Sequence, residues 1–101
     1  RSSDLGYLLA LRRELEQRKR YPSGRQASLE RPQGNVEVWL EVDRSGRVLS
    51  SGIANKAASM LLNRAAMSSL QSISSVKPFP SEAFAGQTTK RFTATFNYQA
   101  P

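Results

Sequence analysis

The chain of 101 residues contains neither cysteine nor histidine. Without cysteine, disulfide bonds and thiolate metal sites are excluded. Without either residue, zinc sites of the usual type and the Ser-His-Asp and Cys-His catalytic arrangements cannot form within the chain. The eight acidic residues are scattered and suggest no acid/base pair, so we expect no enzyme, no cofactor and no metal site. No apolar run approaches the roughly 20 residues that a helix needs to cross a bilayer.

Acidic residues are also few relative to basic ones, because 15 Lys and Arg against 8 Asp and Glu give a net charge of +7. A basic excess is typical of proteins that bind nucleic acids or anionic surfaces. Many of the basic residues fall between Arg12 and Arg31, where Glu14, Glu16 and Glu30 interrupt them. We therefore interpret this region as a solvated helix face. The length fits one domain, residues 1–101, and the lack of an initiator methionine leads us to expect a piece of a longer protein.

The clearest pattern is in residues 34–55, which we predict to form a β-hairpin. Apolar and polar residues alternate in its first half, as in a strand with one apolar face; the apolar ones are Val36, Val38, Leu40 and Val42. Asp43-Arg44-Ser45-Gly46 then supplies typical turn residues. Val48 and Ile53 in the return strand have opposite parity. We therefore expect a β-bulge near residues 50–52 that keeps both side chains on the core face.

Two helices and a third strand complete the predicted elements. A helix over residues 5–19 has an apolar stripe of Leu5, Leu8, Leu11 (or Leu9) and Leu15, and it ends before Tyr21-Pro22 because proline disfavours helical backbone in the preceding residue. A short helical turn is expected at residues 26–29. Residues 59–75 form a second helix that covers the sheet, with Leu61, Leu62, Ala65, Ala66, Leu70 and Ile73 on its apolar face. Residues 88–98 alternate again, with Phe92, Ala94, Phe96 and Tyr98 on the apolar side.

This order of helix, strand, strand, helix, strand predicts an α+β fold with a three-stranded antiparallel or mixed sheet and two helices on one face. The second helix spans the sheet and returns the chain to its starting end. The third strand should therefore run parallel to the second and pair antiparallel with the first, by a right-handed crossover. The expected spatial order is second, first, third. Residues 88–98 then form an edge strand with a row of unpaired N–H and C=O groups.

The ordered set of these features resembles the TonB C-terminal domain family. Tyr21-Pro22 is followed by the alternation from Gly34 to Val42; then come, in order, Gly46-x-Val48, Ile53, Leu61-Leu62-Asn63-x-Ala65-Ala66, Leu70, Pro78-Phe79-Pro80 and Phe92-x-x-x-Phe96. The likeness covers roughly residues 5–98. The link from Pro22 to Gly34 is longer than is usual in the family, and Lys56-Ala57-Ala58 replaces a common Ser-Ser-Gly. These departures bear on the subfamily rather than on the fold.

The resemblance implies a periplasmic domain at the end of a protein anchored in the inner membrane of a Gram-negative bacterium. Such proteins connect a proton-driven motor of the ExbB/ExbD type, through their upstream region, to outer-membrane transporters of siderophores, haem or cobalamin. The domain binds a short extended segment of the transporter, the TonB box, as a strand added beside its own last strand. The resemblance and the free edge together suggest these partner-binding residues: Arg20, Tyr21, Pro22, Thr88, Lys90, Arg91, Phe92, Thr93, Thr95 and Asn97.

Two other functions deserve comparison. A TolA-like domain of envelope integrity shares the architecture, but such domains normally depend on a disulfide, which this chain cannot form. A small nucleic-acid-binding domain is suggested by the charge, but Glu37 and Glu41 lie on the outward row of the first strand, where phosphates would have to pass. We therefore expect no nucleic-acid partner, whereas exposed edges allow a homodimer. Trp39, in the same row, is either a contact residue or is covered by the N-terminal segment or a second chain.

Overall fold

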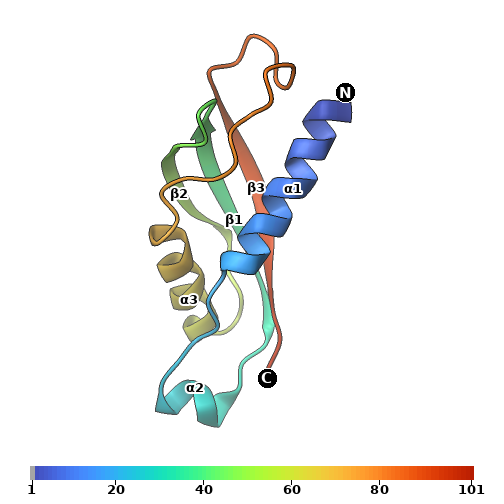
Figure 1. The fold of residues 1–101 in the computed structure, drawn as a ribbon. Helices are drawn as coiled ribbons and strands as arrows, with labels where there is room; N and C mark the ends of the chain where they lie inside the picture. The colour runs from blue at the N-terminus through green and yellow to red at the C-terminus, as the bar shows by residue number, and fades with distance from the viewer. Residues whose placement is uncertain (1) are drawn as a thin grey trace.

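The structure is a computed structural model that describes residues 2–101. Its elements follow the chain in the order α1 (Ser2–Arg18), α2 (Arg25–Glu30), β1 (Gly34–Asp43), β2 (Val48–Asn55), α3 (Met60–Gln71) and β3 (Thr89–Tyr98). The strands form one sheet in the order β2-β1-β3, and β1 is antiparallel to both neighbours. Both long helices, α1 and α3, lie on one face of the sheet (Figure 1). The predicted fold class is confirmed.

The hydrophobic core lies between the sheet and the two long helices. The four alternating apolar residues of β1, from Val36 to Val42, are all fully buried. In β2 the pairing skips one residue at Leu49, because Val42 pairs with Val48 while the preceding Glu41 pairs with Ser50. This bulge keeps Val48 on the core side, as the parity argument required, but it lies one residue before the expected range. A second register shift follows at Ala54.

Helix α1 packs over β3, but its buried face differs from the predicted stripe of leucines. Leu11 and Leu15 are buried as expected, whereas Leu5 and Leu9 are exposed and Tyr7 is buried instead. The ring of Tyr7 joins a cluster of phenylalanine rings, with centroid distances of 5.1 to 5.7 Å to Phe79, Phe84 and Phe92. Its hydroxyl donates to the Lys77 carbonyl at 2.6 Å. A tyrosine can be buried here because its polar end has a partner.

Helix α3 covers β1 and β2 and ends four residues earlier than predicted. Its N-cap is Ser59, whose hydroxyl accepts a hydrogen bond from the Leu62 N–H. After Gln71 the chain pairs with the hairpin turn instead of continuing as a helix. The Ser74 carbonyl accepts from the Val48 N–H at 3.0 Å, and the Val76 N–H donates to the Gly46 carbonyl at 2.8 Å. These long-range bonds satisfy the backbone groups that further helical turns would otherwise have used.

Candidate functional site

Strand β3 lies at an edge of the sheet, so one side of its backbone has no neighbouring strand. In an antiparallel strand the backbone groups of successive residues point to alternate sides. The Thr93 carbonyl and the Asn97 N–H group point away from β1, since both bond to side chains of α1. Thr95 has the same parity, so its N–H and C=O groups also point outward, and nothing else in residues 2–101 bonds to them. The free edge is therefore centred on the exposed Thr95.

The start of β3 faces other parts of the molecule. The Thr88 carbonyl accepts from the Arg44 N–H at 3.1 Å, and the Lys90 ammonium lies over the Phe84 ring at 5.5 Å. Phe92 is only 4% exposed and belongs to the aromatic cluster under α1. Because Phe92 is next to the outward-facing Thr93, its own backbone N–H and C=O groups point the other way, toward β1. Of the predicted edge residues, Phe92 is the one whose side chain the fold keeps away from the surface.

Arg91 lies on the face of the sheet that carries no helix. Its guanidinium stacks on the Trp39 ring at 4.2 Å and forms an ion pair with Glu41 at 3.9 Å. On the other side, Gly52 lies so close to Trp39 that an added Cβ would come within 2.8 Å of the indole nitrogen. Trp39 is thus covered by Arg91 and by the backbone of β2, which is neither of the two covers considered from the sequence.

The three residues predicted before α2 do not all lie beside β3. Tyr21 packs near the end of the strand, with its ring 6.3 Å from that of Tyr98, and its hydroxyl donates to the Pro32 carbonyl at 2.7 Å. All three residues also line a depression against α3, together with Arg64 and neighbouring residues. The Arg20 N–H also donates to the Ser69 hydroxyl of that helix. The structure therefore brings Tyr21 alone of the three to the end of β3.

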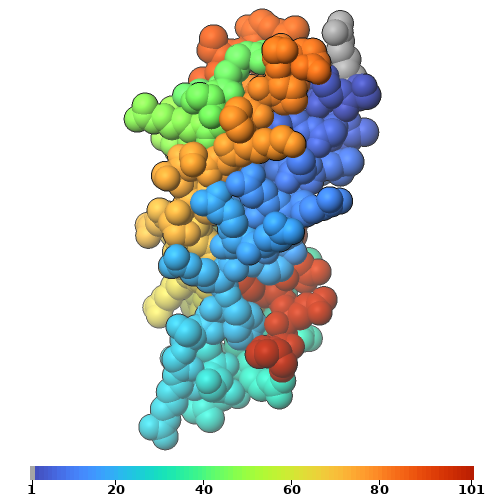
Figure 2. Space-filling view, viewed as in Figure 1, coloured from blue at the N-terminus to red at the C-terminus, as the bar shows by residue number. Residues whose placement is uncertain are grey.

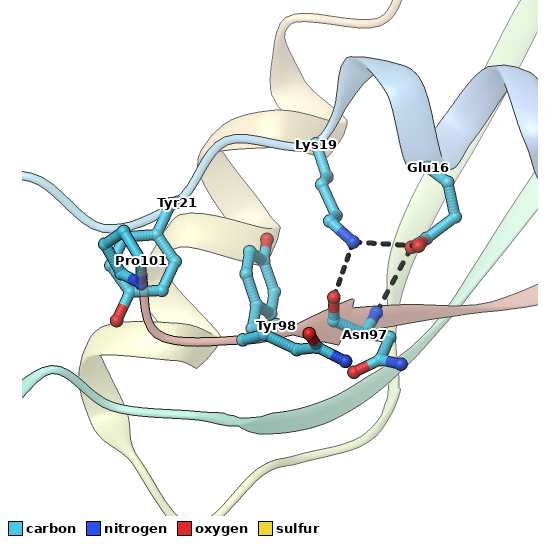
Figure 3. Close-up of a pocket in the computed structure, with 7 residues that line it drawn as sticks. Glu16, Lys19, Tyr21, Asn97, Tyr98 and Pro101 are labelled. Atoms are coloured by element: carbon cyan, nitrogen blue, oxygen red, sulfur yellow. Dashed lines mark hydrogen bonds and ion pairs between the residues drawn. The ribbon is translucent and has the colours of Figure 1, made fainter.

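Two side chains of α1, and that of Lys19 directly after it, contact the β3 edge and were not among the predicted site residues. Arg12 donates to the Thr93 carbonyl at 3.2 Å, and Lys19 donates to the Asn97 carbonyl at 2.5 Å. Glu16 accepts from the Asn97 N–H at 3.1 Å and pairs with Lys19 at 2.8 Å (Figure 3). Positions 12, 16 and 19 follow helical spacing beside the buried stripe, which is the sequence signal that could have identified them.

An open depression of ≈ 500 Å³ lies where β3 ends, beside the last turn of α1. Glu16, Lys19, Tyr21, Asn97 and Tyr98 line it together with the C-terminal residues (Figure 3). The Lys19 ammonium lies 5.6 Å from the centre of the Tyr98 ring. Burial raises the pKa of the Tyr98 hydroxyl, which stays protonated at neutral pH. In Figure 2 the end of the chain, in red, reaches the surface below α1, in blue.

Neither a membrane-spanning helix nor a metal-binding cluster is found among the residues that the structure describes. No helix among them has the length and hydrophobicity to cross a membrane. Within residues 2–101 there is also no group of three or more His, Cys, Asp or Glu that could hold a metal ion.

Comparisons with known proteins agree with this architecture. The family model for the C-terminal region of the Gram-negative bacterial TonB protein matches residues 17–99. The chain is 32% identical over 74 residues to Protein TonB of Pasteurella multocida (strain Pm70), a match that covers 73% of this chain and 28% of that protein. It thus spans less than a third of the length of this relative.

The fold is also similar to that of a solved structure. The NMR solution structure of the TonB C-terminal domain of Helicobacter pylori superimposes with a TM-score of 0.69 at 20% identity. The superposition covers 94% of this chain and 82% of that chain. At this level of identity the similarity shows a shared fold and does not show shared partners.

Proposed function

The chain belongs to the TonB C-terminal domain family, and from this premise we propose that it is the periplasmic, partner-binding domain of a TonB-like energy transducer. The family is transport-related and non-catalytic. The proposed partner is a TonB-dependent outer-membrane transporter of a siderophore, haem or cobalamin. The proposed contact is its TonB box, added as a fourth strand beside β3.

The observation that carries this proposal is the outward backbone of β3. Thr93, Thr95 and Asn97 present their N–H and C=O groups on the side away from β1, and their side chains are exposed. An extended peptide laid along this side would continue the antiparallel sheet. Its main-chain hydrogen bonds would supply affinity, and every second side chain would supply specificity for the partner. Among these residues only Thr95 has both its N–H and its C=O group free of α1 side chains, so pairing should begin there.

The neighbouring side chains supply further proposed contacts. Lys90 and Arg91 lie in the same strand and Thr88 directly before it, while Tyr21 lies at its far end. Arg20 and Pro22 are the neighbours of Tyr21 along the chain. Phe92 would support this surface from the core, because its ring lies beneath α1. The basic residues at the edge would raise the rate of encounter with an acidic segment more than the final affinity.

A strand ladder also suits a mechanical role. A load applied along the strands is shared by several backbone hydrogen bonds at once, so the contact can transmit force without a covalent link. We infer that force reaches the domain from an inner-membrane, proton-driven motor of the ExbB/ExbD type, through the part of the protein that precedes it. The same edge would accept β3 of a second copy, which is the route by which a homodimer would form.

The proposal is tested by NMR titration of the domain with synthetic TonB-box peptides from transporters of the same genome. We expect amide shifts concentrated between Thr93 and Asn97 and extending to Tyr21. Thr95→Pro removes the uncovered N–H donor at an edge position where proline is tolerated, and should weaken binding roughly tenfold. The matched control Thr95→Ala keeps the N–H group and should bind within about twofold of the wild type.

Equal urea midpoints for the two variants would show that both are folded. Unchanged peptide affinity in folded Thr95→Pro would refute the assigned edge. If the wild-type amides do not shift with any peptide, but those along α1 shift on adding nucleic acid or anionic lipid, the result would instead favour binding of an anionic partner through the basic residues.

A further inference from the structure

We propose that α1 is a built-in competitor for the β3 edge, and that an incoming strand must displace its side chains in order to pair. The inference rests on the proposed function, because it assumes that this edge is where a partner strand binds. The competing contacts are made by Arg12 and Glu16 of α1 and by Lys19 directly after it, and we call these three residues the edge cap.

The edge cap bonds to backbone groups that strand addition needs. Arg12 occupies the Thr93 carbonyl, while Glu16 and Lys19 occupy the N–H and the C=O of Asn97. These two capped residues lie on either side of Thr95 and share its outward parity. An incoming strand that pairs with Thr95 therefore meets Thr93 in one direction and Asn97 in the other, and both already have bonded backbone groups.

The helix that carries the edge cap is held firmly in place. Tyr7, Leu11 and Leu15 are each at most 2% exposed, and the Tyr7 hydroxyl is bonded to the Lys77 carbonyl. Arg18 of the last turn also donates to the Ser75 carbonyl at 2.8 Å. Removing α1 from the sheet would expose this apolar face to water. Release of the edge therefore requires rotation of three side chains and leaves the helix where it is.

The edge cap itself is weakly held. The Glu16 and Lys19 side chains keep 39% and 22% of their surface exposed, and an ion pair at such a surface contributes little to stability. Water can replace each displaced bond, so an incoming strand with a full ladder of backbone bonds can win. The match to the family model begins at residue 17. The contacts made by Arg12 and Glu16 therefore come from residues before the matched range.

The test compares the affinity of edge-cap variants for one synthetic TonB-box peptide, by NMR or calorimetry. Arg12→Ala should bind the peptide roughly two- to fivefold more tightly than the wild type, because one competing hydrogen bond is gone. The charge-neutral double variant Glu16→Ala/Lys19→Ala should bind about tenfold more tightly. Arg13→Ala is the matched control, since Arg13 is an exposed arginine on the same helix and its loss changes the net charge equally. It should bind within about twofold of the wild type.

Amide hydrogen exchange of the free protein supplies an independent readout. The Asn97 N–H should exchange several-fold faster in the double variant, because Glu16 no longer accepts its hydrogen bond, while amides of β1 should be unchanged. Peptide affinities of Arg12→Ala and the double variant equal to that of Arg13→Ala, or weaker, would overturn the competitor role and leave the proposed function standing. Absence of peptide binding by the wild type and by every variant would overturn the proposed function and this inference together.

Discussion

Replacing Arg44 with alanine should loosen the connection between α3 and β3. Its guanidinium reaches across to the carbonyl groups of that connection. Nε donates to Gln87 at 2.8 Å, and Nη2 donates to Ala83 at 2.8 Å and to Phe84 at 2.5 Å. A longer contact of 3.4 Å joins Nη1 to the Pro80 carbonyl. One side chain thus bonds to the connection at four points.

The expected loss follows from these contacts. A hydrogen bond to a charged group contributes about 1.5–3 kcal/mol, but bonds from one side chain are not additive, and water can bond to the partly exposed carbonyls once the guanidinium is gone. We therefore expect Arg44→Ala to lower the free energy of unfolding by about 2–3 kcal/mol, a large part of the roughly 5–15 kcal/mol of a typical domain. Arg44→Lys keeps the charge but cannot reach all the carbonyls, so it should lose about half as much.

The measurement is urea unfolding followed by tryptophan fluorescence, with Trp39 in the sheet as the probe. Arg47→Ala is the matched control, because Arg47 is exposed in the same turn and its loss changes the charge equally. It should stay within about 0.5 kcal/mol of the wild type. Equal midpoints for Arg44→Ala and Arg47→Ala would refute the role of the guanidinium as a clamp on the connection.

Two further changes test other parts of the core. Gly46→Ala should cost roughly 2–5 kcal/mol in urea unfolding, because φ is +91° and the added Cβ would lie 2.1 Å from the Val76 carbonyl oxygen. Gly86→Ala, with φ of +81° and open space around the added Cβ, should cost only about 1–2 kcal/mol. Equal losses of stability in the two variants would contradict the clash at Gly46. Tyr7→Phe removes the bond to Lys77 and should cost about 0.5–1.5 kcal/mol at neutral pH. Burial raises the pKa of Tyr7 from 10.0 to about 12, so the contribution of its hydroxyl to stability is present below pH 10 and is lost as the pH rises through about 12. The wild type should therefore lose more stability than the Phe variant over that range. Parallel profiles of stability against pH for the two proteins would contradict this.

The strands could be predicted from the sequence because their signal is local. Each strand needs only alternation along itself, so Val36 to Val42 and Phe92 to Tyr98 identify two core faces without reference to the rest of the chain. The bulge at Leu49 was nearly located for the same reason, since the parity of Val48 and Ile53 requires one. Its place depends on how β2 pairs with β1, which the sequence of β2 alone does not specify.

The helix details depended on distant residues. The choice of Tyr7 over Leu5 and Leu9 for the core follows from a cluster of phenylalanine rings and from the Lys77 carbonyl, about seventy residues further along the chain. The early end of α3 follows from pairing between residues 74–76 and the hairpin turn. A helical pattern in sequence cannot show either contact, because both depend on where the hairpin lies in the fold.

The edge itself could be predicted from connectivity, because strand order leaves residues 88–98 with one neighbour. The edge cap could not, because it joins α1 to β3 across about eighty residues of sequence. The charges at positions 12, 16 and 19 were visible but were interpreted as a solvated face. Their helical spacing shows that they share a side of α1, and only the packing of α1 on β3 shows that this side meets the edge.

The arrangement separates stability from binding within one helix. Tyr7, Leu11 and Leu15 hold α1 on the sheet by apolar burial, which a partner strand does not disturb. Arg12, Glu16 and Lys19 cover the edge with exposed polar bonds, which a partner strand can replace. An uncovered edge invites pairing with any extended chain, including a second copy, and edge strands are commonly protected by charged side chains for this reason. Here the charges of the edge cap come from α1 and the residue after it, so the strand keeps a backbone that a cognate partner can use in full.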